Sequence, residues 1–229
     1  MKWNKKFNYL KSLKSIKKKL GNYYFGENKL PSVTTILDAT ISEEKKASLK
    51  NWREKIGTEE ADKITLEARI RGTSMHTVIE EYLLGQDRIK FEDINDQAFN
   101  MAKEIIENGL KEKLTEIWGS EVILYYPKLY AGTTDCVGVY EGQESIIDFK
   151  QTNKPKKEEY IEDYYLQLGA YALAHNKVFE SNITQGVILM CSTNKMFQKF
   201  NIDGKKFEEF QEKFLNKVDQ YHKQISKKL

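Results

Sequence analysis

Cysteine is scarce in this sequence. The only two, Cys136 and Cys191, lie far apart and form no CxxC pair. Two isolated thiols cannot supply the set of ligands that holds a structural zinc ion or an iron–sulfur cluster. Such sparse use of cysteine is typical of a protein from a reducing compartment. We therefore expect no iron–sulfur cluster and no cysteine-ligated zinc.

Long hydrophobic segments are also missing. No apolar run approaches the length of a membrane-spanning helix. The first 20 residues contain neither the apolar core of a secretory signal peptide nor the arginines typical of a mitochondrial transit peptide. Only four of the 37 basic residues are arginine. We expect a cytoplasmic protein, from a bacterium or a phage-infected cell rather than from a mitochondrion, with no membrane partner.

Positive charge is concentrated at the N-terminus. Residues 1–26 hold eight lysines and no acidic residue, whereas the rest of the chain holds the other 29 basic residues and all 34 acidic ones. Between residues 3 and 20, apolar residues recur at helical spacing and lysines fill the opposite face. This pattern predicts a basic amphipathic arm or helix at 1–26, followed by a single domain at 27–229. The lysine face is either solvated or in contact with a polyanion.

The periodicity of the remaining chain alternates between helical and extended. Helices are expected at 42–55, 59–84, 94–118, 159–176 and 205–228, and strands at 121–126, 131–140, 144–152, 183–192 and 196–202. This order predicts an α/β (α+β) domain with a mixed sheet flanked by helices. Among the charged residues in these elements, Glu121, His175 and His222 are expected to be solvated.

Two consecutive predicted strands carry acidic residues within otherwise apolar stretches. Asp135 lies in G-T-T-D-C-V, and Asp148 and Lys150 lie in I-I-D-F-K, with a hairpin turn at Glu141-Gly142 between them. Asp148 and Lys150 share one face because they are two residues apart on a strand. Mg²⁺ prefers carboxylate oxygens and activates water for phosphodiester cleavage. The alternative is a plain ion pair on the solvent face.

Two predicted helices add polar pairs. His76 and Glu80 are four residues apart, as are Gln167 and Tyr171, so each pair shares a helix face. Each pair also has a structural interpretation, as a core histidine beside a surface acid and as a surface amide beside a half-buried ring. Ser32 is placed to cap a helix, and the free amides at such a helix start can also bind phosphate.

Together these motifs resemble the PD-(D/E)xK nuclease superfamily, in its RecB-like exonuclease branch. The motifs occur in the family's order: G-T-S-M-H-T-V-I-E at 72–80, G-T-T-D at 132–135, D-F-K at 148–150 and Q-L-G-A-Y at 167–171. Within that branch the chain is similar to the mitochondrial genome maintenance exonuclease 1 group, through P-S-V-T-T-I-L at 31–37 and the stretch 132–156. The composition favours a phage or bacterial homologue. The resemblance covers 31–176 and implies a restriction-endonuclease-like core that uses Mg²⁺ or Mn²⁺.

The resemblance also implies roles for individual residues. His76, Asp135 and Asp148 match metal ligands, with the Phe149 backbone carbonyl assisting. Lys150 matches the catalytic lysine, and Asp148, Asp135, Glu80 and Gln167 complete the predicted catalytic set. We further predict DNA contacts from residues around the site: Ser32, Thr34, Arg71, Gln151, Thr152, Lys154, Lys156, Gln167 and Tyr171. The family has Thr-Ser after the lysine, whereas this chain has Gln151-Thr152.

The predicted function is therefore a metal-dependent DNA exonuclease that prefers single-stranded ends and acts in replication, repair or recombination. Two alternatives share the same fold: an exonuclease that acts on duplex ends in recombination, and a structure-specific endonuclease. A third alternative is a DNA-binding module without catalysis. A circular single strand is spared by an exonuclease that needs an end and cut by an endonuclease. Measuring turnover distinguishes a nuclease from a DNA-binding module without catalysis.

Overall fold

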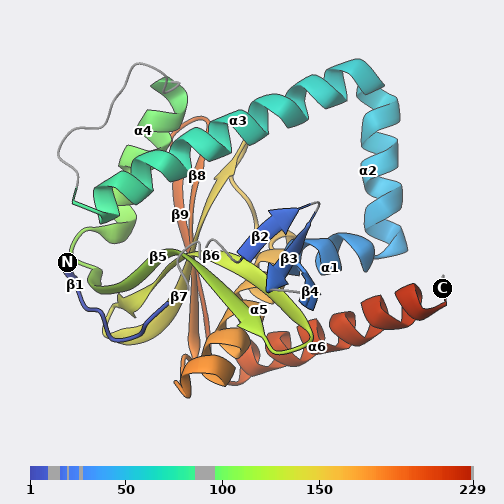
Figure 1. The fold of residues 1–229 in the computed structure, drawn as a ribbon. Helices are drawn as coiled ribbons and strands as arrows, with labels where there is room; N and C mark the ends of the chain where they lie inside the picture. The colour runs from blue at the N-terminus through green and yellow to red at the C-terminus, as the bar shows by residue number, and fades with distance from the viewer. Residues whose placement is uncertain (10–15, 20, 26–27, 86–95, 228–229) are drawn as a thin grey trace.

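A six-stranded mixed sheet forms the centre of the molecule (Figure 1). The computed structural model describes residues 1–9, 16–19, 21–25, 28–85 and 96–227. The strand order is β1-β5-β6-β7-β8-β9, with β1 (Lys2–Trp3), β5 (Leu114–Tyr126), β6 (Tyr130–Tyr140), β7 (Gln143–Thr152), β8 (Gln185–Ser192) and β9 (Phe197–Asp203). The β1–β5 and β7–β8 pairs are parallel and the others are antiparallel. The predicted mixed sheet is confirmed.

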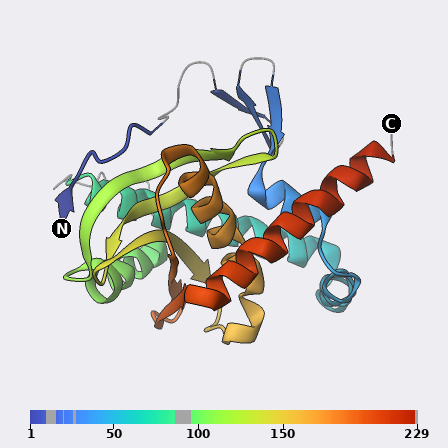
Figure 2. The same cartoon turned by 90° about the horizontal axis from the view of Figure 1, so that it is seen from below.

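Helices cover both faces of this sheet (Figures 1 and 2). On one face lie α3 (Thr58–Leu83), α4 (Asp96–Ile105) and a π-helical turn at Ile106–Leu110. On the other lie α5 (Glu162–Phe179), which follows a short 3₁₀ turn at Glu158–Tyr160 and links β7 to β8, and α6 (Gly204–Ser226). Each face of the sheet packs against its helices to form a hydrophobic core. Successive side chains of β7 point to opposite faces, so Ile146 packs in the core on the α5 side and Ile147 in the core on the α3–α4 side.

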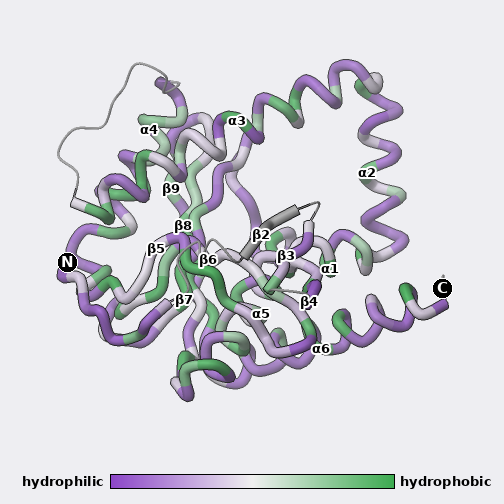
Figure 3. The backbone as a smooth tube through the Cα atoms, viewed as in Figure 1, coloured by the Kyte–Doolittle hydropathy of each residue, from purple (hydrophilic) through white to green (hydrophobic). Residues whose placement is uncertain are grey.

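A small antiparallel sheet and two projecting helices surround one end of the main sheet. The small sheet consists of β2 (Ile16–Lys19), β3 (Asn22–Phe25) and β4 (Asn28–Pro31), and a bridge from Ser32 to Ala131 connects it to β6. The short helix α1 (Val33–Ala39) follows. Helix α2 (Glu43–Ile56) buries none of its residues, and the first half of α3 buries only Ala61. These segments extend beyond the sheet and are mostly hydrophilic in Figure 3.

The predicted N-terminal helix is wrong for the described residues. Lys2 and Trp3 form β1 against β5, and residues 16–19 form β2 against β3. Residues 10–15 and 20 lie outside the described residues. Sheet edges satisfy the backbone hydrogen bonds here, and tertiary contacts of this kind override a helical pattern. The division of the chain into an arm at 1–26 and a domain at 27–229 stays a prediction.

The predicted helix at 94–118 ends earlier than expected. Leu110, Leu114 and Ile117 follow one another at helical spacing, but the chain turns at Glu112, whose φ of 62° is left-handed. Leu114 then pairs with Tyr140, and Ile117 pairs with Gly138, as residues of β5. The apolar spacing fits both structures, and the long antiparallel partner β6 decides in favour of the strand.

His175 is buried rather than solvated. Its Nε2 lies 2.8 Å from the Tyr9 hydroxyl, and its Nδ1 lies 2.6 Å from the Ser181 hydroxyl. The ring of Phe7 packs edge-on against it. His175 therefore joins the N-terminal segment to the end of α5. His222 is half-buried. No helix in the described part of the chain has the length and apolarity to cross a membrane.

Candidate active site

Strands β6 and β7 separate at the candidate site. They pair from Tyr140–Gln143 up to Cys136–Ile147. Beyond that point β6 continues along β5, and β7 continues along β8. Asp135 and Asp148 are the first residues after the last pair, so the two acids lie in the fork between the diverging strands. The sequence motifs had placed these residues on neighbouring strands, and the structure brings them together.

The backbone of Phe149 is held from both sides of the fork. Its N–H donates to Asp135 Oδ2 at 2.7 Å, and its carbonyl accepts from His76 Nε2 at 2.9 Å. Because a carbonyl can only accept, Nε2 carries the proton, and the neutral imidazole then has its lone pair on Nδ1. These two bonds link α3, β6 and β7 and fix the orientation of His76.

The other side of His76 faces two carboxylates. Nδ1 lies 3.6 Å from Asp135 Oδ1 and 3.9 Å from Glu121 Oε1. One ligand atom from each of these three residues lies within 4.8 Å of the others. The family motifs do not mark Glu121. The signal that could have found it is its position in β5, where Ser120 and Val122 pair with Cys136 and Thr134 and so place Glu121 beside Asp135.

Asp148 and Lys150 form a buried ion pair in the same fork. Asp148 is 2% exposed, and its Oδ2 contacts Lys150 Nζ. Lys150 Nζ also lies 5.1 Å from the centre of the Tyr164 ring on α5. The pair is therefore not the solvent-face interaction considered as the alternative. Asp148 lies outside the trio of His76, Glu121 and Asp135, so its role as a metal ligand stays a prediction.

Burial and charge–charge interactions together shift the pKa of His76, Asp135, Asp148 and Lys150. Burial lowers the pKa of His76, but Asp135 and Glu121 raise it, with a net rise to about 9. Burial raises the pKa of Asp135 against the opposing effects of His76 and Lys150. Burial also raises the pKa of Asp148, which Lys150 lowers in turn, to about 6. For Lys150 the lowering by burial is outweighed by Asp148 and Asp135, so its pKa rises.

These residues fit a divalent cation. Three carboxylates and one imidazole lie in or beside the fork, and His76, Glu121 and Asp135 each place one ligand atom within 4.8 Å of the others. Carboxylate oxygens suit Mg²⁺ and Mn²⁺, and an imidazole nitrogen is a common additional ligand. The Phe149 carbonyl lies beside His76 and already accepts one hydrogen bond there. Its assistance to a cation stays a prediction.

Helix α5 supports the fork from the other face. Gln167 Nε2 donates to the Tyr171 hydroxyl at 3.0 Å, and Tyr171 is 3% exposed. The Tyr171 ring packs directly on Gly132 of β6, where an added Cβ would lie 2.5 Å from ring atom Cε1. The glycine of the G-T-T-D motif thus makes room for this ring. Because Tyr171 is buried, its main contacts are within the protein, and a DNA contact from it or from Gln167 stays a prediction.

The start of α1 presents hydroxyls near the bridge to β6. Ser32 caps the helix by accepting from Thr35 N at 3.0 Å, as predicted, and is itself buried. Thr34 is exposed, and its hydroxyl lies 3.0 Å from Ser32 Oγ. Ser32 thus has a structural function, and phosphate contact by either residue stays a prediction.

Gln151 and Thr152, which replace the family's Thr-Ser, are both engaged within the protein. Gln151 Oε1 accepts from Arg71 Nε at 2.9 Å, and Gln151 Nε2 donates to the Ala68 carbonyl at 3.1 Å. Thr152 is buried and donates to the Lys154 carbonyl at 2.9 Å. Gln151 therefore holds the guanidinium of Arg71 beside the end of β7. DNA contacts from these side chains stay predictions.

The predicted lysines lie in the loop after β7. Lys154 is exposed, and Lys156 is half-buried with its backbone bonded to the side chain of Gln198. Arg71 also donates to Asn153 in the same loop. Lys154 and Lys156 thus belong to the loop that follows β7, and Arg71 is bonded to the end of β7 and to this loop. Their contact with DNA is not tested by the structure and stays a prediction.

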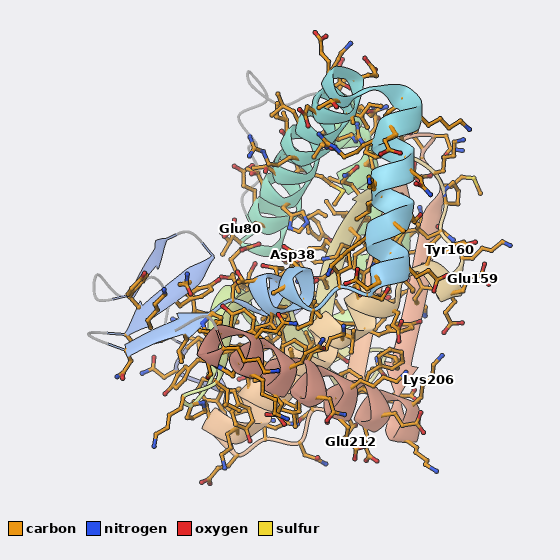
Figure 4. All side chains as sticks on the ribbon, turned by 90° about the vertical axis from the view of Figure 1, so that its right-hand side faces the viewer. Asp38, Glu80, Glu159, Tyr160, Lys206 and Glu212 are labelled. Atoms are coloured by element: carbon orange, nitrogen blue, oxygen red, sulfur yellow. The ribbon has the colours of Figure 1, made fainter. Side chains whose placement is uncertain are left out.

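Glu80 lines an open cleft beside the fork. The cleft has a volume of about 380 Å³ and is lined by Gly72, Thr73, His76, Thr77, Glu80 and Glu121. Figure 4 labels Glu80 on α3. It lies one helical turn beyond His76 but does not belong to the trio whose ligand atoms cluster. The trio thus takes its third member, Glu121, from β5, and a catalytic role for Glu80 stays a prediction.

Comparison with known proteins shows relatives for most of the chain. It is 27% identical over 176 residues to mitochondrial genome maintenance exonuclease 1 of Mus musculus, 28% over 174 residues to that of Xenopus tropicalis, and 27% over 173 residues to that of Homo sapiens. These matches cover 71%, 70% and 71% of this chain. The chain spans about half the length of these relatives, at 50%, 48% and 49%. No family model matches the chain.

Solved structures overlap with the chain more loosely. A candidate exonuclease from Eubacterium rectale matches with a TM-score of 0.47 and 11% identity over 68% of this chain and 66% of its own. An alkaline exonuclease from Laribacter hongkongensis matches with a TM-score of 0.33 and 14% identity over 66% of this chain and 80% of its own.

Proposed function

We propose that the chain, which is similar over 70–71% of its length to mitochondrial genome maintenance exonuclease 1, is a metal-dependent DNA exonuclease of the PD-(D/E)xK type that prefers single-stranded ends. The observation that carries the proposal is the fork between β6 and β7. It gathers two buried acids, Asp135 and Asp148, with the half-buried His76 and Lys150: Asp148 pairs with Lys150, and Asp135 and His76 both bond the Phe149 backbone. The cluster opens on the cleft along α3.

Each residue of the fork has a chemical task in this proposal. His76 and Asp135, both fixed by the Phe149 backbone, would hold the cation together with Asp148. A divalent cation bound there would offset charge on the phosphoryl oxygens and lower the pKa of the attacking water. Lys150, anchored by Asp148 and by the Tyr164 ring, would orient that water and add positive charge facing the phosphate.

An exposed apolar face of α3 supports the preference for single strands. Thr73 and Thr77 line the cleft, and the same helix face continues outwards to Ile70 and Leu66 at spacings of three and four residues. Ile70 is 53% exposed and Leu66 is 47% exposed. A duplex buries its bases, whereas a single strand presents them to apolar and aromatic side chains. Arg71, next to Ile70, would meet the phosphate backbone.

The experiment that tests this function compares three substrates of the same sequence. A linear single strand with an end label, its circularised form, and a blunt duplex are incubated with the protein and Mg²⁺, and then with EDTA. We expect release of short products from the linear strand alone, and none in EDTA. Cleavage of the circle would indicate an endonuclease, and faster digestion of the duplex would indicate a duplex-end exonuclease. Binding without cleavage of any substrate would leave a DNA-binding module.

A further inference from the structure

Glu121 occupies an unusual position in the sheet. The residues on either side of it in β5, Ser120 and Val122, are buried and pair with β6. Glu121 itself has a side chain that is 37% exposed and lines the cleft with His76. Its carboxylate thus reaches the fork from β5, whereas Asp148 lies on β7 and Asp135 lies on β6 between these two strands.

Glu121 has a left-handed backbone conformation inside a β-strand. Its φ is 49°, in the left-handed region that a non-glycine residue adopts at a cost of about 1 kcal/mol or more. Five other described non-glycine residues have positive φ, and all of them lie at turns or helix ends: Glu112, Lys128, Glu141, Glu180 and Lys195. Among the described residues, Glu121 alone has this conformation inside a strand. Such strain persists where a function requires the side-chain direction.

The distances from His76 to its two carboxylates are too long for hydrogen bonds and are compatible with ligands that share one ion. Its Oε1 lies 3.9 Å from His76 Nδ1, and Asp135 Oδ1 lies 3.6 Å from the same nitrogen. Both distances exceed hydrogen-bond length. Two ligand atoms that each lie about 2.1 Å from one cation are separated by roughly 3.0 to 4.2 Å, depending on the angle between them. Both distances fall inside that range.

We propose that Glu121 is a direct ligand of the divalent cation, additional to the ligands that the family motifs imply. Glu121, His76 and Asp135 then form one face of the ion's coordination shell, contributed by β5, α3 and β6. The inference rests on the proposed metal-dependent function and adds a specific residue to it. The competing explanation is that Glu121 serves only to pair with His76 and holds α3 against the sheet.

Manganese binding without DNA distinguishes these explanations. Protein freed of metal is titrated with Mn²⁺, and free Mn²⁺ is measured by electron paramagnetic resonance while the unfolding temperature is recorded in parallel. We expect Glu121→Gln to weaken Mn²⁺ binding by about 10-fold or more and to leave the metal-free unfolding temperature nearly unchanged, because relief of the repulsion between Glu121 and Asp135 offsets the lost attraction between Glu121 and His76. Glu112→Gln is the matched control, since Glu112 is exposed and also left-handed. It should bind Mn²⁺ as the wild type does.

A second variant separates the carboxylate from the backbone strain. Glu121→Gly removes the carboxylate and also relieves the strain, because glycine adopts a positive φ freely. Its metal-free unfolding temperature should therefore be no lower than that of Glu121→Gln, and it should still bind Mn²⁺ weakly. Wild-type Mn²⁺ affinity in Glu121→Gln or Glu121→Gly would overturn the inference and leave the proposed function standing, and a lowered metal-free unfolding temperature in the same variant would assign Glu121 to the pairing role. Failure of the wild-type protein to bind Mn²⁺ would overturn both.

Discussion

Replacing Gly132 by alanine should damage the support of the candidate site through a single side chain. The added Cβ would lie 2.5 Å from Tyr171 Cε1, 3.2 Å from the Tyr171 hydroxyl and 3.2 Å from Val33 Cγ2. The ring cannot withdraw freely, because it is buried and its hydroxyl is bonded to Gln167. Overpacking of this kind reduces the free energy of unfolding by about 1 to 3 kcal/mol. We expect the upper half of that range because the closest approach is about 1 Å too short.

A double-mutant cycle measured by urea unfolding tests this explanation. Tyr171→Leu alone should destabilise by about 2 to 4 kcal/mol, since it removes ring contacts and one hydrogen bond. In the double variant the new methyl group no longer meets a ring, so the combined loss should fall short of the sum by about 1 kcal/mol or more. Gly72→Ala, in a helix and with its nearest neighbour at 3.4 Å, is the control and should be neutral or stabilising. Additive losses at Gly132 and Tyr171 would refute the reasoning.

Three further predictions concern other parts of the chain. Burial lowers the pKa of His175 from 6.5 to about 4, so between these pH values the unfolded state binds a proton that the folded state does not. In urea titrations the stability advantage of wild type over His175→Gln should be complete above pH 6.5 and shrink by up to about 3 kcal/mol as the pH falls to 4. An advantage independent of pH would contradict this. Gln151→Ala frees the Arg71 guanidinium and should lower affinity for an oligonucleotide by about 3- to 10-fold, measured by fluorescence anisotropy with a catalytically inactive protein; unchanged affinity would show that the clamp does not position Arg71 for DNA. Replacing Leu66 and Ile70 together by serine should weaken binding of a single strand by about 10-fold and hardly affect a duplex, whereas an equal effect on both would remove the evidence for strand preference.

The chemistry of the fork is readable from the sequence because it depends on local patterns. Alternation places Asp148 and Lys150 on one face of a strand, and the hairpin turn brings the strand of Asp135 alongside. The divergence of β6 and β7 at these residues is not visible in either strand alone. Beyond the last β6–β7 pair, β6 stays paired with β5, and β7 stays paired with β8, which returns from α5 as a parallel strand.

The missed features depend on contacts between distant residues. His175 is buried because Tyr9, 166 positions away, covers it. Residues 114–118 form part of β5 because β6 pairs with them, although their apolar spacing continues the helical pattern of the preceding residues. Glu121 resembles an ordinary strand residue in the sequence, and only the positions of His76 and Asp135 make it a candidate ligand. Local periodicity cannot determine where such partners lie.

The central claim is that the fork of β6 and β7 is the catalytic centre of a DNA exonuclease. The most direct test is the single-turnover rate at which an end-labelled linear single strand is shortened in Mg²⁺, compared between wild type and Lys150→Met. We predict a loss of about 100-fold or more in that rate, with oligonucleotide affinity reduced by much less. A Lys150→Met protein that shortens the strand at the wild-type rate would contradict the assignment of the site.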